Sequence, residues 1–320
     1  MRTRQAPPVG YPPAAMSQAI SSAPAPLSKG AVFLRRLFSF IILWSVVIGA
    51  LFSGHKALSD WVFLFIVAAL AVCGLLEFYG MVRRLGYACF DKLGILGGLL
   101  LIFATFVYIS GDFRPAASPS RMNDFETSFF ILFVLGLCLR QFLSRHVNTG
   151  ILAISTTLLG LMYVPWLLNF IQKINFFGQA GVDGHYYVLY FVLVTKFSDC
   201  GAYAAGSLFG RHKMIPRISP GKTWEGFAGA IVVSTAASVC FARWAGPRLT
   251  GMTLAHSIVL GIILSTAAVI GDLIESLFKR EAGLKDSGHL FPGIGGILDL
   301  LDSLLFNAPL MYLYLRHILT

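Results

Sequence analysis

The sequence predicts an all-α, polytopic integral membrane protein with about nine transmembrane helices and a cytoplasmic N-terminus. Three observations predict this class. Hydrophobic residues make up 56% and charged residues 12% of the 320-residue chain, whereas soluble domains contain about 45–50% and about 25%. Long apolar runs follow one another, and basic residues gather in alternate segments between them. Such a composition excludes a wholly disordered chain and a soluble globular enzyme.

The chain divides into three regions by composition. Residues 1–30 are rich in Pro and Ala without an apolar period, which is typical of a flexible cytoplasmic tail. The first apolar run begins only near Leu37 and lacks a convincing small-residue cleavage site, so we expect no signal peptide. We expect N-terminal transmembrane helices over 31–195 and a C-terminal catalytic transmembrane domain with cytoplasmic loops over 196–320.

Nine apolar runs are candidate spans. A spanning helix needs about 17–25 residues, which several runs reach once their flanks are included. Two runs are short, so the count is uncertain by one. Uninterrupted apolar runs predict helices, because a membrane β-barrel shows strict alternation instead. The runs are Leu37–Phe52, Trp61–Leu76, Leu93–Ile109, Phe129–Leu139, Ile151–Ile171, Tyr186–Thr195, Phe227–Ala242, Leu254–Ile270 and Ser303–Tyr314.

The basic residues support this topology. With the N-terminus inside, the inner segments hold 18 of the 25 Lys and Arg residues and the outer segments hold 7. Basic residues collect in cytoplasmic loops of membrane proteins, so the net charge of +10 needs no nucleic-acid partner. The five cysteines form no C-x-x-C pair, which argues against a disulfide framework or a thiolate metal site.

The inner segment 196–226 is rich in glycine and polar residues. It contains Ser219-Pro-Gly-Lys222-Thr223, which lacks the preceding glycine of a P-loop because position 216 is proline. A turn with exposed amides, a lysine and two hydroxyls could still hold phosphate. The alternative is a polar loop that only reverses the chain. Three glycines allow close helix packing or close approach to a ligand: Gly201, Gly206 and Gly210.

The inner segment 271–302 carries the densest set of carboxylates. On a helix, Asp272, Glu275 and Lys279 share one face, and Asp299 and Asp302 are three residues apart at the start of the last span. Two such helices would bring carboxylates together at the membrane boundary. Oxygen-only ligands suit Mg²⁺ rather than Zn²⁺. The alternative is a salt-bridge array whose basic members are positive-inside anchors.

Two further ionisable residues have mainly structural interpretations. Glu77 ends the second run, and we interpret it as an interfacial carboxylate that reaches water, with a lipid pocket as the alternative. His289 lies beside a turn signal, Pro292-Gly293, and such a lone histidine is more often structural than catalytic.

These two inner segments resemble the phosphatidate cytidylyltransferase family, also called CDP-diacylglycerol synthase. The resemblance covers residues 196–305 by motif and extends over 37–195 only as a series of spans. Asp199–Tyr203 and Ser219–Gly226 are similar to the family's cytoplasmic loop. Three positions depart from the pattern: Ile294 replaces a His, Leu300 an Arg and Gly221 a Lys. The residues that match the long motif are Ser276, Lys279, Arg280, Lys285, Asp286, Gly288, Phe291, Pro292, Gly295, Gly296, Asp299 and Asp302.

The resemblance implies transfer of CMP from CTP to phosphatidic acid in phospholipid biosynthesis, giving CDP-diacylglycerol and pyrophosphate. It implies Mg²⁺ as the cofactor and leaves room for a second cation. On this hypothesis, the residues that bind metal are Asp272, Asp299, Glu275 and Asp199. Those that bind substrate phosphates are Ser219, Lys222, Thr223 and Lys213. Those with catalytic roles are Lys279, Arg280, Lys285, Asp286 and Asp302.

The expected partners are CTP, phosphatidic acid and membrane lipid, with no nucleic acid, and a homodimer is compatible with the sequence. A bacterial inner membrane is the expected location, with the active site on the cytoplasmic side. Three other functions stay open at this point: an inactive paralogue, a transporter, and a CTP-dependent transferase acting on another lipid phosphate. The complete set of metal-binding carboxylates favours the enzyme.

Overall fold

The computed structural model describes residues 49, 55–110, 119–144, 149–177, 182–288 and 295–320. In these residues, 8 helices of 19 to 29 residues are long and apolar enough to cross a membrane. They confirm an all-α membrane fold and match the last eight of the predicted runs. The run Leu37–Phe52 falls almost wholly outside the described residues. The count of nine spans and the side of the N-terminus therefore stay predictions.

The helices of the N-terminal half include one interrupted span. Between α6 and α7 the chain forms a single π-helical turn around Pro165, so that residues 150–175 cross as one continuous element. A proline in a helix removes one backbone hydrogen bond, and π-helical geometry in proteins occurs mostly as such single turns inside α-helices. The elements of this half are α3 (Lys56–Arg84), α4 (Asp91–Ile109), α5 (Pro119–Phe142), α6 (Gly150–Leu161), η1 (Met162–Trp166) and α7 (Leu167–Asn175).

The C-terminal half adds a short β-hairpin to its helices. Strands β1 and β2 pair antiparallel, with Lys213 opposite Thr223, where the sequence indicated only a turn. Such short strands containing Pro and Gly carry little strand signal. Thr223 then begins a helix, since its Oγ1 accepts the Gly226 N–H at 3.1 Å. The elements are α8 (Gly184–Phe209), β1 (Lys213–Ile215), β2 (Ser219–Thr223), α9 (Trp224–Ala245), η2 (Gly246–Arg248), α10 (Leu254–Glu281), α11 (Ile297–Tyr314) and η3 (Leu315–Leu319).

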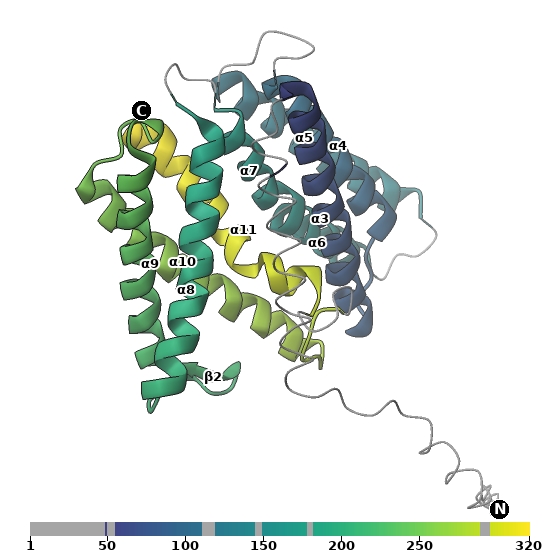
Figure 1. Ribbon diagram of the computed structural model, residues 1–320. Coiled ribbons are helices and arrows are strands. Elements are labelled where there is room, and N and C mark those ends of the chain that lie inside the picture. Colours follow the sequence, from purple (N-terminus) through teal and green to yellow (C-terminus); the bar gives the residue numbers. More distant parts are fainter. Residues whose placement is uncertain (1–48, 50–54, 111–118, 145–148, 178–181, 289–294) are drawn as a thin grey trace, which may run out of the picture.

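The last long helix joins the two halves of the molecule. Figure 1 shows α8, α9 and α10 on one side, α3 to α7 on the other, and α11 between them. Helix α11 contacts α10 and α8 as well as α7 and α3. Its apolar side chains Leu298, Leu305 and Ala308 are fully buried. The core of the protein therefore runs along α11, and the site described below lies at its N-terminal end.

Helices α10 and α11 cross at Gly271. A Cβ atom at this position would lie 2.5 Å from the backbone oxygen of Asp302 and 2.9 Å from the Phe306 ring. Real Cβ atoms do not approach other atoms so closely, so the crossing requires glycine. Small residues at helix crossings let membrane helices approach closely. Gly271 therefore sets how closely the carboxylates of the two helices approach each other.

Replacing Gly271 by alanine should destabilise the protein by about 1–3 kcal/mol, because overpacking a tight contact forces backbone shifts. Thermal unfolding in detergent would measure this as a lowered midpoint. Gly136→Ala on α5 is the matched control, since a Cβ there meets nothing within 4 Å. Equal midpoints for the two variants would contradict the assigned role of Gly271.

A buried polar network links the helices of the N-terminal half. The Lys173 ammonium lies 2.6 Å from Glu126 Oε2, and the two residues are 4% and 7% exposed. Asn169 donates to the other Glu126 oxygen at 3.2 Å and to Thr105 at 2.8 Å. The topology count placed Lys173 in an outer segment, whereas the structure buries it within α7. Polar contacts among α4, α5 and α7 therefore help to hold this half together.

Candidate active site

A cavity of about 580 Å³ lies among α8, the hairpin, α9, α10 and the start of α11. Its wall combines carboxylates, hydroxyls and one ammonium with apolar side chains such as Met214, Phe227 and Val269. The N-terminus of α9 also borders the cavity, because Thr223 and Gly226 are among the lining residues. The residues predicted from the sequence that line the cavity are Asp199, Ser219, Lys222, Thr223, Asp272, Asp299 and Asp302.

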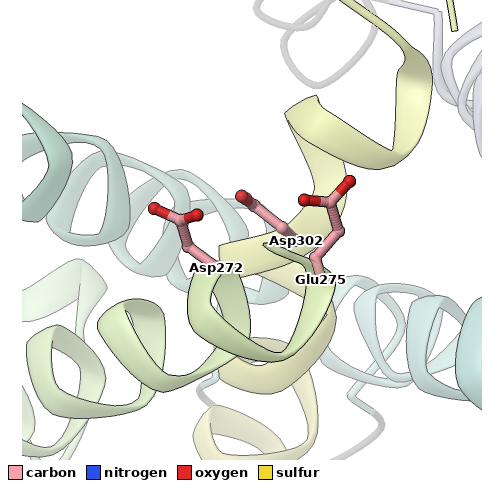
Figure 2. A group of neighbouring side chains, drawn as sticks. All are labelled: Asp272, Glu275 and Asp302. Carbon is pink, nitrogen blue, oxygen red and sulfur yellow. The ribbon is translucent and has the colours of Figure 1, made fainter. Parts of the chain in front are cut away.

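Three carboxylates meet beside this cavity, and two of them, Asp272 and Asp302, line it. Asp272, Glu275 and Asp302 each offer an oxygen, and these atoms lie within 4.8 Å of one another. Figure 2 shows the Asp302 carboxylate, carried by α11, between those of Asp272 and Glu275 on α10. Glu275 is fully buried and Asp302 is 8% exposed. The spacing of three on α10 and the crossing at Gly271 together create this group.

Two lysines reach the same carboxylates. Lys222 of β2 places its ammonium 2.8 Å from Asp272 Oδ2 and donates to the carbonyl oxygen of Val269 at 3.2 Å. Lys279 lies one helical turn after Glu275, and its ammonium is 2.5 Å from both Glu275 Oε2 and Asp299 Oδ1. The lysines therefore link the hairpin to α10, and α10 to α11.

Asp299 lies beside the three-carboxylate group rather than within it. Its Oδ1 faces Lys279, while its Oδ2 accepts hydrogen bonds from the Gly296 N–H at 2.8 Å and the Ser287 N–H at 3.1 Å. Asp299 is thus held by the loop before α11 and by α10. Of the two carboxylates at the start of the last span, Asp302 reaches the carboxylates of α10.

Asp199 forms another corner of the cavity. The Lys196 ammonium lies 3.4 Å from the Asp199 carboxylate and donates to the carbonyl oxygen of Leu300 at 3.2 Å. Ser303 connects the same carboxylate to α11, with its hydroxyl 3.5 Å away. Leu300, where the resembling motif carries arginine, therefore has a lysine ammonium beside its backbone. The other substituted motif position, Ile294, lies outside the described residues.

Six of the predicted site residues do not line the cavity. Two of them, Glu275 and Lys279, are buried beside the carboxylates described above, and the other four are exposed. Lys213, Lys285 and Asp286 are exposed and are absent from its lining. Arg280 is exposed as well, and its side chain donates to the carbonyl oxygen of Ile218 at 3.2 Å. Arg280 thus fastens the hairpin turn to the end of α10. Their roles in phosphate binding and catalysis stay predictions, and each would require movement toward the cavity.

The sequence missed two residues that shape the site. Glu77 comes from α3, and its carboxylate accepts hydrogen bonds from the first turn of α11, a contact that the sequence did not indicate. Ser287 donates to this carboxylate at 2.8 Å and lies 3.0 Å from Asp299 Oδ2. Of the two, only Glu77 gave a signal in the sequence, as an ionisable residue near the end of an apolar run. Its partners, the backbone amides of α11, lie about 220 residues later in the chain.

The three-carboxylate group has the properties of a hard-cation site. Its donor atoms are all oxygens, which divalent cations such as Mg²⁺ prefer. Glu275 Oε1 is buried and accepts no hydrogen bond from any described residue. A buried polar atom without a partner is rare and calls for an explanation such as a bound ion. The residues present therefore fit a divalent cation held by Asp272, Glu275 and Asp302.

Comparison with known proteins agrees with this chemistry. Residues 34–318 match the model of the cytidylyltransferase family. The phosphatidate cytidylyltransferase of Mycobacterium bovis is 31% identical over 255 residues, which cover 78% of this chain and 79% of that protein. The phosphatidate cytidylyltransferase of Haemophilus influenzae is 28% identical over 86% of this chain and 96% of its own length.

A shorter match is to protein YnbB of Escherichia coli K12, which is 35% identical over 161 residues. That match covers 50% of this chain and 51% of YnbB, so the chain spans about half the length of that relative. The family model, in contrast, covers nearly every described helix, including the four that surround the cavity. The chain therefore belongs to the cytidylyltransferase family.

Proposed function

We propose that this protein transfers CMP from CTP to phosphatidic acid, giving CDP-diacylglycerol and pyrophosphate. The observation that carries the proposal is the group of Asp272, Glu275 and Asp302 beside Lys222, in a cavity between membrane-spanning helices. Carboxylates that hold a cation, next to a lysine that binds phosphate, form the arrangement that transfer between phosphates needs. The family and the names of the two phosphatidate cytidylyltransferases support CTP as the nucleotide and phosphatidic acid as the lipid.

The reaction needs no protein nucleophile. The phosphate oxygen of phosphatidic acid attacks the α-phosphorus of CTP, forming one P–O bond, while the bond between the α- and β-phosphates breaks and pyrophosphate leaves. The protein must hold two anions in line and stabilise the charge that develops on the leaving group. Lys222 and the N-terminus of α9, capped by Thr223, supply positive charge and amide donors for this purpose.

Mg²⁺ is the cation that we propose for the three carboxylates, where it would offset phosphate charge when bound. Lys222 and Lys279 already face Asp272 and Glu275, so the site is partly neutralised by the protein itself. We propose that Lys222 exchanges its carboxylate partner for a nucleotide phosphate when CTP enters. Ser219 and Thr223, which line the same wall, are placed to donate hydroxyl hydrogen bonds to phosphate oxygens.

The cavity is suited to a lipid substrate because it lies where helices end. Tyr203, which lines the cavity, is exposed near the end of α8. Phe209 and Trp224 are exposed at the end of α8 and the start of α9. Aromatic side chains of this kind gather at the boundary between membrane and water. A phospholipid headgroup could therefore reach Lys222 while its acyl chains stay among the helices.

We further propose that this boundary is the cytoplasmic one, in a bacterial inner membrane. Support comes from the basic residues: the segments at the cavity end belong to the set that holds 18 of the 25 Lys and Arg residues. The bacterial relatives favour the inner membrane. CTP would then reach the site directly from the cytoplasm.

Purified protein mixed with phosphatidic acid, Mg²⁺ and CTP labelled in its α-phosphate should incorporate label into the lipid phase. EDTA should remove this incorporation, because the carboxylate group would lose its cation, and added Mg²⁺ should restore it. Extraction and thin-layer separation of the lipids measures the product. Label that enters another lipid phosphate, but not phosphatidic acid, would replace the proposed acceptor. Absence of both labelling and CTP binding would favour an inactive paralogue.

A further inference from the structure

Glu77 connects the N-terminal helices to the active site through the first turn of α11. Its Oε1 accepts the backbone N–H of Ile297 at 2.8 Å, and its Oε2 accepts that of Leu298 at 2.9 Å. The first amides of a helix have no partner within the helix, and a negative charge is favoured there by the helix dipole. A carboxylate from α3 therefore caps a helix that begins 220 residues later in the chain.

Ser287 extends this contact to the cavity wall. Its hydroxyl lies 2.8 Å from Glu77 Oε2 and 3.0 Å from Asp299 Oδ2. A hydroxyl has a single proton, so it couples the two carboxylates by donating to one at a time. Asp299 in turn faces Lys279 at 2.5 Å. An unbroken series of contacts thus runs from α3 to Lys279, which also contacts Glu275.

Two glycines pack directly against the Glu77 carboxylate and leave no room for a side chain. A Cβ atom at Gly288 would overlap Glu77 Oε1, and one at Gly296 would overlap Glu77 Oε2 and the Ser287 hydroxyl. Both positions belong to the long motif of the sequence. Their glycines are therefore explained by close approach to a carboxylate that comes from the other half of the molecule.

We infer that Glu77 is a positioning residue for the transfer reaction. It fixes the first turn of α11 and, through Ser287, the orientation of the Asp299 carboxylate at the cavity. Glu77 is not part of the cavity lining, so it acts through these groups rather than on substrate. The kinetic part of this inference rests on the proposed function, whereas its structural part does not.

The test replaces Glu77 by glutamine in the full-length protein. Glutamine keeps the shape but loses the charge, and its NH₂ group would face amide donors. Residues that orient functional carboxylates typically change activity by about 10- to 100-fold when they are altered. We therefore expect kcat to fall about 10- to 100-fold with little change in KM for CTP, since no substrate contact is removed. Glu77→Asp, which keeps the charge, should retain more activity than Glu77→Gln.

Hydrogen–deuterium exchange supplies a readout that is independent of activity. Peptides covering residues 295–302 should exchange faster in Glu77→Gln than in wild type, because the Ile297 and Leu298 amides lose their acceptor. Glu281→Gln is the matched control, since Glu281 is exposed at the end of α10. It should leave kcat and exchange unchanged.

Wild-type kcat or wild-type exchange in Glu77→Gln would each overturn the inference. If Glu77→Gln fails to fold, Ser287→Ala tests the inference instead. This variant removes the hydroxyl that links Glu77 to Asp299 but leaves Glu77 as the cap of α11. Its kcat should fall about tenfold with the exchange of residues 297–298 nearly unchanged, and a wild-type kcat would overturn the inference. If wild-type protein transfers no label from CTP, the proposed function fails, while the exchange comparison still decides the structural link.

Discussion

Asp302→Asn should reduce transfer of label from CTP to lipid by about 100-fold or more, the scale expected when a group that stabilises transition-state charge is removed. Asp302 is nearly buried and completes the group with Asp272 and Glu275. Asparagine has the same shape but offers one neutral oxygen, so the group loses one of its three carboxylates. Initial rates over a range of Mg²⁺ concentrations would measure the loss and show whether excess cation recovers part of it.

The control for this prediction is Asp183→Asn. Asp183 lies just before the N-terminus of α8, whereas the cavity is lined by the C-terminal part of that helix, and Asp183 pairs with His185 at 3.4 Å. The same chemical change there should leave the rate unchanged. Size-exclusion profiles should match wild type for both variants, because neither changes side-chain volume. A rate near that of wild type for Asp302→Asn would refute the assignment of Asp302 to the cation site.

Lys222→Met should lower kcat/KM for CTP by about 100- to 1000-fold, because one preorganised cation would no longer face the phosphates. The lysine is half-buried, lies 2.8 Å from Asp272 and lines the cavity. Methionine keeps most of the length and apolar volume of the stem. The variant also leaves Asp272 without its ion pair, so weaker CTP binding should appear together with tighter Mg²⁺ binding.

Arg217→Met is the matched control, because Arg217 is exposed in the turn of the same hairpin and does not line the cavity. Removing this charge should change kcat/KM by no more than the small effect expected of a solvated surface charge. Isothermal titration with CTP would separate binding from turnover. Equal effects for the two variants would mean that the hairpin contributes only general positive charge.

The sequence predicted the fold class well because hydropathy is a local property. Eight apolar runs became spanning helices, and the helical spacing of Asp272 and Glu275 placed both carboxylates on one face of α10, as expected. Lys222 was recognised by its turn-like neighbours. In each case the signal lay within a few residues, and no distant contact was needed to interpret it.

The remaining features depend on contacts between distant segments. Whether Asp299 or Asp302 meets the α10 carboxylates is decided by the crossing at Gly271, which periodicity does not encode. Burial of Lys173 depends on Glu126 from another helix. A single sequence shows which residues share a helix face but not the rotation of one helix against the next, so these details required the structure.

The cap on α11 also constrains how the molecule is made. Chains are synthesised N-terminus first at about 5–20 residues per second, so the 220 residues between Glu77 and Ile297 take about 10 to 45 seconds to emerge. During that interval the α3 carboxylate has none of its final backbone donors. Because burying a charge without partners is costly, this carboxylate should stay hydrated until α11 arrives. Assembly of the site therefore waits for α11, and a chain released before that helix would lack both the complete three-carboxylate group and the central helix.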